Sequence, residues 1–400
     1  MNTTSIEHKD KPMNIGNIDG TLAKHLTEDP GNEPLISRRA MLVKGTAALG
    51  GLLLRRAMLT GGATALGEMV DGNSARAQTP GLGADVKEYD ISANGITLHV
   101  TEQGKGPAVL FCHGFPDTSY TWRRQMKVLA AAGYRAIAPD MRGYGRSSAP
   151  RDANLYTPLY TVGDLVGLLD AISVPRAVIV GHDWGSVVAS SAALMRPDRF
   201  SAVLLMNTSY APRGDASVLD HMRASGHATT FYMFEQIGPK ADEIWSDAAI
   251  TIPGVLYWAS ASAPADGRWN PLDPARSLYR RAPGQLPEWA ERDYVAHNVA
   301  EFQRTGFHGG LNYYRAAQPF FDLSSPWKGA KITQPAFVIS GAADGANIMF
   351  PTQPDQLRVG LPNLVGSVVL DNVGHWSQHE AANLVGQHLL SFLHSTRGSN

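Results

Sequence analysis

The sequence predicts an α/β fold built on a mostly parallel sheet, with a helical segment inserted between two of its strands. From residue 86 onward, short apolar strands alternate with stretches of helical spacing, which is typical of a parallel sheet flanked by helices. Between Pro212 and about Pro326 this alternation stops, and a segment rich in Trp, Tyr, Phe, Pro and Arg replaces it. A Gly-x-Asp-x-Gly motif at residues 181–185 lies between an expected strand and an expected helix.

The spacing of apolar residues and the positions of turn residues predict each strand and helix of the core. Residues 86–91 and 96–100 predict a hairpin, because Asn94-Gly95 suits its turn. Further strands are expected at 108–112, 134–139, 177–180, 201–206, 335–340 and 367–370, and helices at 120–132, 161–172, 186–195 and 381–392. The expected organisation is a core from residues 78–211 and 327–400, about a sheet of the eight-stranded type, with residues 212–326 inserted.

The inserted segment is interpreted as a helical lid over an apolar pocket. Four of the eight tryptophans lie in it, and residues 287–303 have helical spacing. A long aromatic insertion between two sheet strands is typical of a segment that covers a binding site. A separate domain that touches no site is the alternative. The four tryptophans are Trp245, Trp258, Trp269 and Trp289.

Composition bounds the function before any motif is considered. The chain has 400 residues, 44% apolar and 18% charged. Its 35 basic and 36 acidic residues nearly balance, so no field attracts nucleic acid, and no nucleic-acid partner is expected. The single cysteine, Cys112, excludes an intramolecular disulfide. It lies in an apolar run, which favours a buried hydrophobe over a nucleophile beside His113.

Residues 1–77 are expected to be a leader and export signal outside the fold. Residues 38–42, Arg-Arg-Ala-Met-Leu, precede a small-residue and leucine stretch too short for stable membrane insertion, which needs about 20 apolar residues. This pattern indicates twin-arginine export machinery as a partner and a periplasmic or secreted protein. The same five residues recur at 55–59, so either copy can be the working signal. Ala75-Arg76-Ala77 predicts cleavage near Gln78; the alternative is a disordered leader on a cytoplasmic protein.

Asp183 is the strongest chemical signal in the chain. In the related Gly-x-Ser-x-Gly elbow, glycines flank the nucleophile because the sharp strand-to-helix turn has no room for larger side chains. Here the central residue is a carboxylate, which is nucleophilic at neutral pH without an activating base. Asp183 would attack an sp³ carbon and form an alkyl ester. A surface turn with this spacing is the alternative, and the aspartate disfavours a serine esterase.

A second motif, at residues 111–116, also follows a strand directly. Gly114 permits close backbone approach, and the amide of Phe115 can point at a developing oxyanion together with the amide of Trp184. His113 and Pro116 are interpreted as residues that support this loop, and His113 is not the expected base. Residues 140–148 form a glycine-rich loop that lacks the Lys-Ser of a phosphate cradle, which indicates a structural role.

Asp344 and His375 follow Asp183 along the chain in the order nucleophile, acid and histidine. Asp344 follows the strand expected at 335–340, and His375 lies on a loop before the last helix. His375 would activate water against the ester, and Asp344 would orient the imidazole and stabilise its charge.

Residues 86 to about 395 resemble the epoxide hydrolases of the α/β-hydrolase superfamily. The resemblance rests on residues 113–116, the loop at 140–148, the elbow at 181–185, Asp344, residues 374–376 and the lid stretch Gly-Phe-His-Gly-Gly-Leu-Asn-Tyr-Tyr-Arg at 306–315. It implies an α/β-hydrolase fold, and it implies that Tyr314 is the acid that opens the epoxide ring. A phenol, with a reference pKa of about 10, stays protonated at neutral pH and can donate to the leaving oxygen. Ordinary aromatic packing in the lid is the alternative for Tyr314.

The second lid tyrosine of that family has a less direct match. The family places it four residues before the Phe of a Phe-Gln-Glu-Pro-Gly segment, which residues 234–238 resemble. That position holds Thr230, so Tyr232 would serve only if the lid helix were two residues shorter. Otherwise Tyr314 acts alone, with a lower rate or altered regiochemistry.

Haloalkane dehalogenases share the aspartate elbow and are the main competing family. Their leaving halide needs hydrogen-bond donors, and many members use an asparagine side chain as one of them. This chain has Phe115 at that position, and a phenylalanine side chain cannot donate. Fluoroacetate dehalogenases carry Arg where this chain has Trp184. A non-catalytic binding module would lack the nucleophile, acid or histidine, and none is missing. The sequence therefore predicts hydrolysis of a small apolar epoxide to a vicinal diol, with no metal or organic cofactor.

Overall fold

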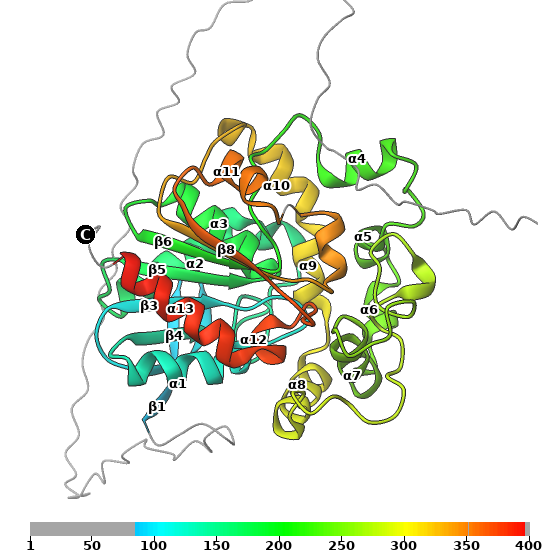
Figure 1. The fold of residues 1–400 in the computed structure, drawn as a ribbon, viewed down its shortest axis with the longest axis horizontal. Coiled ribbons are helices and arrows are strands. Elements are labelled where there is room, and N and C mark those ends of the chain that lie inside the picture. The colour runs from blue at the N-terminus through cyan, green and yellow to red at the C-terminus, as the bar shows by residue number, and fades with distance from the viewer. Residues whose placement is uncertain (1–84, 351, 397–400) are drawn as a thin grey trace, which may run out of the picture. The chain divides into compact units, whose positions relative to one another are not determined.

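A mixed sheet of eight strands runs through residues 85–350 and 352–396, which are the residues that the computed structural model describes (Figure 1). The strand order is β1-β2-β4-β3-β5-β6-β7-β8. The pairs β1–β2 and β2–β4 are antiparallel and the remaining pairs are parallel. The strands are β1 (Val86–Ala93), β2 (Ile96–Gly104), β3 (Ala108–Cys112), β4 (Arg135–Pro139), β5 (Ala177–His182), β6 (Phe200–Met206), β7 (Ala336–Gly341) and β8 (Leu364–Leu370). The predicted α/β class and hairpin are confirmed.

Helices cover both faces of the sheet because successive strand residues point to opposite sides. Val109 and Phe111 of β3 pack in one cluster with residues of α1 and α13. Leu110 and Cys112 pack in the other, with residues of α2 and α3. The helices of the core are α1 (Arg123–Ala131), α2 (Pro158–Ala171), α3 (Trp184–Met195), α11 (Pro354–Gly360), α12 (Ser377–Glu380) and α13 (Ala382–Thr396).

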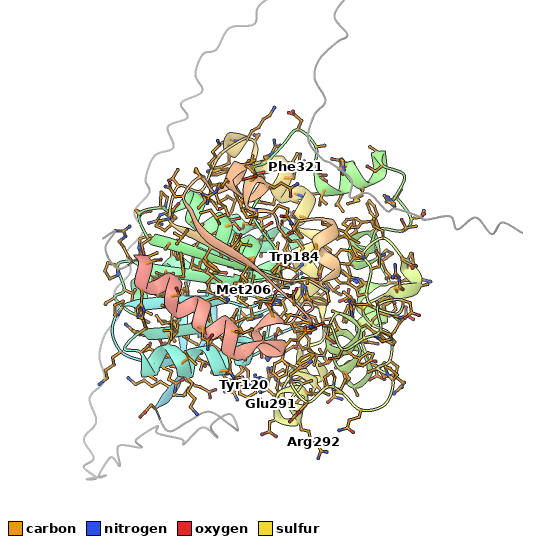
Figure 2. The ribbon with its side chains drawn as sticks, viewed as in Figure 1. Tyr120, Trp184, Met206, Glu291, Arg292 and Phe321 are labelled. Carbon is orange, nitrogen blue, oxygen red and sulfur yellow. The ribbon has the colours of Figure 1, made fainter. Side chains whose placement is uncertain are left out.

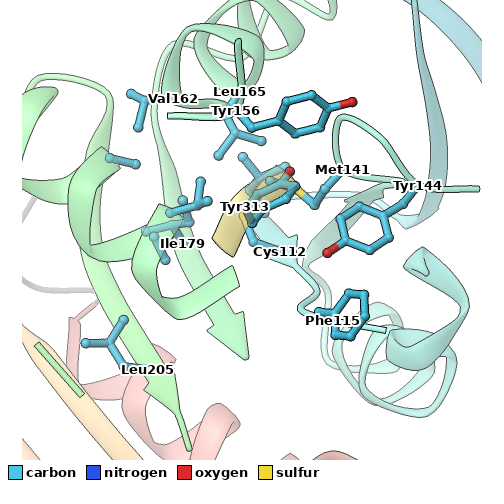
Figure 3. Close-up of a cluster of buried hydrophobic side chains, with 14 of the residues drawn as sticks. Cys112, Phe115, Met141, Tyr144, Tyr156, Val162, Leu165, Ile179, Leu205 and Tyr313 are labelled. Carbon is cyan, nitrogen blue, oxygen red and sulfur yellow. The ribbon is translucent and has the colours of Figure 1, made fainter. Parts of the chain in front are cut away.

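Cys112 lies inside the second of these clusters. Figure 3 shows it at the end of β3 near Ile179, Met141 and Tyr313. Its side chain is fully buried, and burial raises the pKa of the thiol, so a reactive thiolate is disfavoured. The interpretation of Cys112 as a buried hydrophobe agrees with this environment.

The segment between β6 and β7 is helical, and within residues 207–335 the structure places only an isolated bridge, Arg213 to Lys328, in place of strands. Figure 1 shows α5, α6, α7 and α8 together beside the sheet. The helix predicted at 287–303 starts later, because Pro287 to Ala290 forms a turn in which the Ala290 amide donates to the Pro287 carbonyl. The helices are α4 (Val218–Ala224), α5 (Tyr232–Gln236), α6 (Ala241–Trp245), α7 (Ala248–Trp258), α8 (Arg292–Thr305), α9 (His308–Arg315) and α10 (Ala317–Leu323).

The leader and export signal predicted at residues 1–77 lie outside the described residues. Among the helices that the structure does describe, none combines the length and apolar character needed to cross a membrane.

Candidate active site

Asp183 occupies a strained turn between β5 and α3. Its backbone has φ 54° and ψ −122°, and α3 begins at the next residue, two positions earlier than predicted. A Cβ on Gly181 would lie 2.3 Å from the carbonyl oxygen of Gly185, and one on Gly185 would lie 2.0 Å from that of Cys112. The flanking glycines are therefore required by close backbone approach, which is the physical basis of the elbow.

Replacing Gly185 by alanine is expected to lower the free energy of unfolding by about 1–3 kcal/mol, because the methyl group collides with backbone that cannot move aside. Gly386, inside α13, is the matched control, since a Cβ there meets only ordinary contacts at 3.6 Å. Gly386→Ala is expected to stabilise the protein by about 0.5–1 kcal/mol through helix propensity. Urea unfolding of both variants measures the difference, and equal effects would contradict this account of the elbow.

Two backbone amides stabilise the charge of the Asp183 carboxylate. The Phe115 amide donates to Asp183 Oδ1 at 2.8 Å, and the Trp184 amide beside it also favours the charged form of the carboxyl group, against the burial that raises its pKa. A Cβ on Gly114 would lie 2.4 Å from the same Oδ1, so only glycine leaves room for this approach. The structure thus brings together the two amides that the sequence predicts for an oxyanion hole.

His113 holds the loop that carries Phe115. Its Nε2 accepts from the Met141 amide at 2.9 Å, and its Nδ1 donates to the Gly114 carbonyl at 3.0 Å. Burial lowers the pKa of His113 to about 4, against the opposing charge of Asp140, so the ring is neutral at pH 7. Pro116 follows Phe115 through a cis peptide bond in the same loop. The contacts of His113 suit the supporting role predicted for it.

His375 lies between two carboxylates. Its Nδ1 is 3.2 and 3.1 Å from the two oxygens of Asp344, and its Nε2 is 3.7 Å from Asp183 Oδ2. Asp344 also accepts from the Ala346 amide at 2.9 Å and from Asn207 Nδ2 at 2.8 Å. The residues predicted as nucleophile, acid and base therefore form one connected row.

Electrostatics couples these three groups. Burial raises the pKa of Asp183, while protonated His375 and the two amides favour its charged form. Burial alone would lower the pKa of His375, but the charge and hydrogen bond of Asp344 and the charge of Asp183 outweigh it and raise this pKa to about 9. His375 is therefore protonated in the resting site at neutral pH.

Tyr314 and Tyr232 meet beside the carboxylate. Their ring centroids are 6.0 Å apart, and the Tyr314 ring lies 4.9 Å from that of Trp184. Tyr314 contacts Trp184 and Tyr232 edge to face, with interplanar angles of 79° and 88°. The neighbouring Tyr313 donates its hydroxyl to the Arg142 carbonyl at 3.1 Å, whereas the pKa of Tyr314 is raised by burial and also by the charge of Asp183, to which it lies close.

Both phenols are held in their protonated forms. Burial, followed by the negative charge of Asp183 among other neighbours, raises the pKa of Tyr232 and of Tyr314 above the ordinary value for tyrosine. The position of Tyr232 follows from α5, which is only five residues long and starts at this residue. Thr230, the position given by family spacing, lies before the helix and contacts His227.

A cavity of about 230 Å³ opens onto Asp183. Trp184 and Tyr232 contribute to its wall, and most of the remaining lining is apolar, from α3, α5, α9 and α10. Trp269 lies outside this wall, with its ring 5.3 Å from Tyr232 and 6.0 Å from His375. In the described part of the chain, no group of three or more His, Cys, Asp or Glu side chains is placed to hold a metal ion.

Sequence reasoning missed two residues that fix the geometry of His375 and Asp344. Asn207, directly after β6, donates to Asp344 and to the Gly374 carbonyl at 3.1 Å. Glu380 accepts from the amides of Gly374, Trp376 and Ala261. The position of Asn207 in the sequence could have indicated its role, since polar residues at the carboxyl ends of parallel strands gather at one edge of the sheet. Nothing in the sequence indicates the role of Glu380, because its partners are backbone groups.

Replacing Glu380 by glutamine is expected to slow the step that depends on His375 about tenfold, because the amides on both sides of His375 lose charge-assisted acceptors worth about 1.5–3 kcal/mol each. The ratio kcat/KM should stay within about twofold, because it depends only on binding and ester formation, and Glu380 does not line the cavity. Glu243→Gln, at an exposed residue of α6, is the matched control. Steady-state and single-turnover kinetics separate the two effects, and a change in KM alone would contradict a positioning role.

Comparison with known proteins gives consistent similarities. Residues 107–382 match the family model for the alpha/beta hydrolase fold. An epoxide hydrolase of Caballeronia sordidicola is 67% identical over 315 residues, which span 79% of this chain and 96% of the relative. Epoxide hydrolase A of Mycobacterium tuberculosis is 34% identical over 328 residues, 78% of this chain and 98% of the relative. The solved structure of an epoxide hydrolase from an endophytic Streptomyces has a TM-score of 0.73 and 34% identity, covering 79% of this chain and 97% of that one.

Proposed function

The chain belongs to the epoxide hydrolases of the α/β-hydrolase superfamily, and from this premise we propose that it converts an epoxide to a vicinal diol through an alkyl ester on Asp183. One observation carries the proposal furthest. Asp183 Oδ1 is bound by the Phe115 amide, while Oδ2 faces His375 Nε2 at 3.7 Å. One oxygen is thereby held for the oxyanion, and the other is left for attack.

In the first step, Asp183 Oδ2 attacks an epoxide carbon and the ring carbon–oxygen bond breaks. The electron pair moves to the departing oxygen, which needs a proton. One of the two lid phenols, Tyr314 or Tyr232, gives up its proton to that oxygen and becomes a phenolate, since both are kept protonated and lie next to the carboxylate. The product of this step is a neutral ester on Asp183 with a free hydroxyl on the adjacent carbon.

In the second step, His375 acts on water. Forming the ester removes the negative charge of Asp183, which helps to hold the pKa of His375 at about 9. The pKa then falls, the proton of His375 passes to the phenolate left by ring opening, and the neutral imidazole can take a proton from water. Hydroxide attacks the ester carbonyl, the Phe115 and Trp184 amides stabilise the oxyanion, and collapse releases the diol. Asp344 keeps the imidazole oriented throughout.

This sequence of charges predicts the pH dependence of ester hydrolysis. His375 must be neutral, so the rate constant should rise with pH and level off above the pKa of His375 in the ester form. Because the ester lacks the Asp183 charge that raises this pKa, the midpoint should lie below about 9. Rapid-quench measurement of ester decay from pH 5 to 10 tests this, and a midpoint above 9, or a rate that falls with pH, would contradict it.

A panel of epoxides and haloalkanes tests the overall reaction. Purified protein should form diol from aliphatic and aryl epoxides and release no halide from haloalkanes of similar size. The amide of Phe115 is bound to Asp183, and its side chain has no hydrogen-bond donor to offer a halide. Halide release without epoxide turnover would overturn the proposal in favour of a dehalogenase.

Residues 1–77 are proposed to direct twin-arginine export of the folded enzyme. The proposal is supported by the two Arg-Arg-Ala-Met-Leu copies, at 38–42 and 55–59, and by Ala75-Arg76-Ala77. Expression in a host with this export machinery should place epoxide hydrolase activity in the periplasm, with processing near Gln78. Replacing each arginine pair by lysines, singly and together, identifies the working copy. Unprocessed, cytoplasmic protein in the unaltered chain would refute export.

A further inference from the structure

A second chamber adjoins the cavity at Asp183. This outer chamber has a volume of about 380 Å³ and shares walls with the inner cavity, among them Val187 of α3, Phe320 of α10 and Met349. Figure 2 labels Trp184, which borders the inner cavity, and Phe321, which borders the outer chamber. Because one set of residues lines both spaces, a ligand held at Asp183 has the outer chamber directly beside it.

The outer chamber offers an apolar surface to whatever enters it. Leu194, Leu219, Phe321 and Trp327 contribute apolar side chains to its wall. An occupant with polar groups would have to compete for partners, because burying an unpaired polar group costs free energy. The chamber therefore favours a hydrocarbon occupant.

Polar side chains in the same wall already have protein partners. Ser191 Oγ donates to the Val187 carbonyl at 2.8 Å, and Ser217 Oγ donates to Gln318 Oε1 at 2.7 Å. Arg213 donates through Nε to the Phe321 carbonyl, and its guanidinium lies 3.9 Å from the centroid of the Phe321 ring. The polar groups of these side chains therefore bond to other protein atoms, and the surface left facing the chamber is mainly aliphatic and aromatic.

The sizes of the two spaces indicate how they are used. The inner cavity, at about 230 Å³, is below the range of about 300–1,000 Å³ typical of small-molecule sites, and the two spaces together reach that range. We infer, on the basis of the proposed function, that the substrate is an epoxide with one long, uncharged apolar arm. The epoxide ring reacts in the inner cavity, and the arm extends past Val187 and Phe320 into the outer chamber.

Lengthening the apolar arm of the substrate is expected to raise kcat/KM. Burial of each methylene group stabilises the bound state enough to change kcat/KM by up to about fourfold, as long as the group enters the chamber. The gain should stop once the chamber is full. A chain that reached bulk solvent instead would gain little from each added carbon.

The experiment combines a series of terminal epoxides of increasing alkyl length with one chamber-filling variant. Ala216 lines the outer chamber but not the inner cavity, and it is exposed, so Ala216→Trp has room to be accommodated and can fill the chamber without reaching Asp183. Ala224→Trp, at the exposed end of α4 and outside both walls, is the matched control.

The wild type and Ala224→Trp should show kcat/KM rising at least about 100-fold from the four-carbon to the ten-carbon epoxide. Ala216→Trp should lose about tenfold or more for the ten-carbon epoxide and stay within about twofold for the four-carbon one. A flat length dependence in the wild type, or equal losses for both substrates in Ala216→Trp, would overturn the inference while the proposed function stands. Absence of diol from every epoxide would instead refute the proposed function.

Discussion

His375→Gln is expected to accumulate the alkyl ester on Asp183. Glutamine cannot take a proton from water, so ester hydrolysis should slow by about 10²–10⁴-fold while ester formation continues. Mass spectrometry of the intact variant after incubation with an aryl epoxide should show a gain equal to the substrate mass, and peptide analysis should place it on Asp183.

The Asp183→Asn variant is the control for that experiment. Its amide is a poor nucleophile, and it keeps nearly the same volume, so it should form no adduct under the same conditions. An adduct in Asp183→Asn, or none in His375→Gln despite substrate consumption, would show that the covalent intermediate forms elsewhere or does not form.

Removing both lid phenols is expected to produce the second large effect. Tyr232→Phe combined with Tyr314→Phe should lower the rate constant of ester formation by about 10²–10⁴-fold, because no proton donor remains for the departing oxygen. The phenylalanine rings keep most of the aromatic packing around Trp184 and Trp269. Rapid-quench measurement of ester formation gives the result directly.

The single variants divide the work between the two tyrosines. If both donate, each single variant should lose less than the double variant, and their losses need not add, because the two hydroxyls interact. Tyr313→Phe is the matched control, because its ring also lines the cavity but its hydroxyl donates to the Arg142 carbonyl. A double variant with normal ester formation would contradict the role of both phenols.

The sheet and the elbow could be predicted because their signals are local. Asp183 lies between an apolar run and small helix-forming residues, and the glycines on either side are required because a Cβ there would lie only 2.0 or 2.3 Å from a backbone oxygen. The loops with Phe115, Asp344 and His375 likewise follow strands directly. In a parallel sheet the carboxyl ends of strands meet at one edge, so chain order was sufficient to group these residues.

The roles of Tyr232 and Glu380 could not be predicted from the sequence around them. The position of Tyr232 depends on α5 starting at that residue, whereas family spacing gives Thr230, two residues earlier, as the place of the second tyrosine. Glu380 contacts backbone amides of Ala261 in the insertion and of Gly374 and Trp376 in the core. Those contacts depend on how the insertion packs on the core, as do the walls of the outer chamber, and hydrophobic period carries no information about that packing.

The most direct test of the covalent mechanism is a single turnover in heavy-oxygen water. With enzyme in excess over epoxide, the first diol should contain only ordinary oxygen, because its new oxygen comes from Asp183 Oδ2. The heavy oxygen should instead appear in the Asp183 carboxylate, detected by mass spectrometry of the peptide that contains residues 177–195. Heavy oxygen in the diol from the first turnover, with an unlabelled Asp183, would show that water attacks the epoxide directly and would contradict the mechanism.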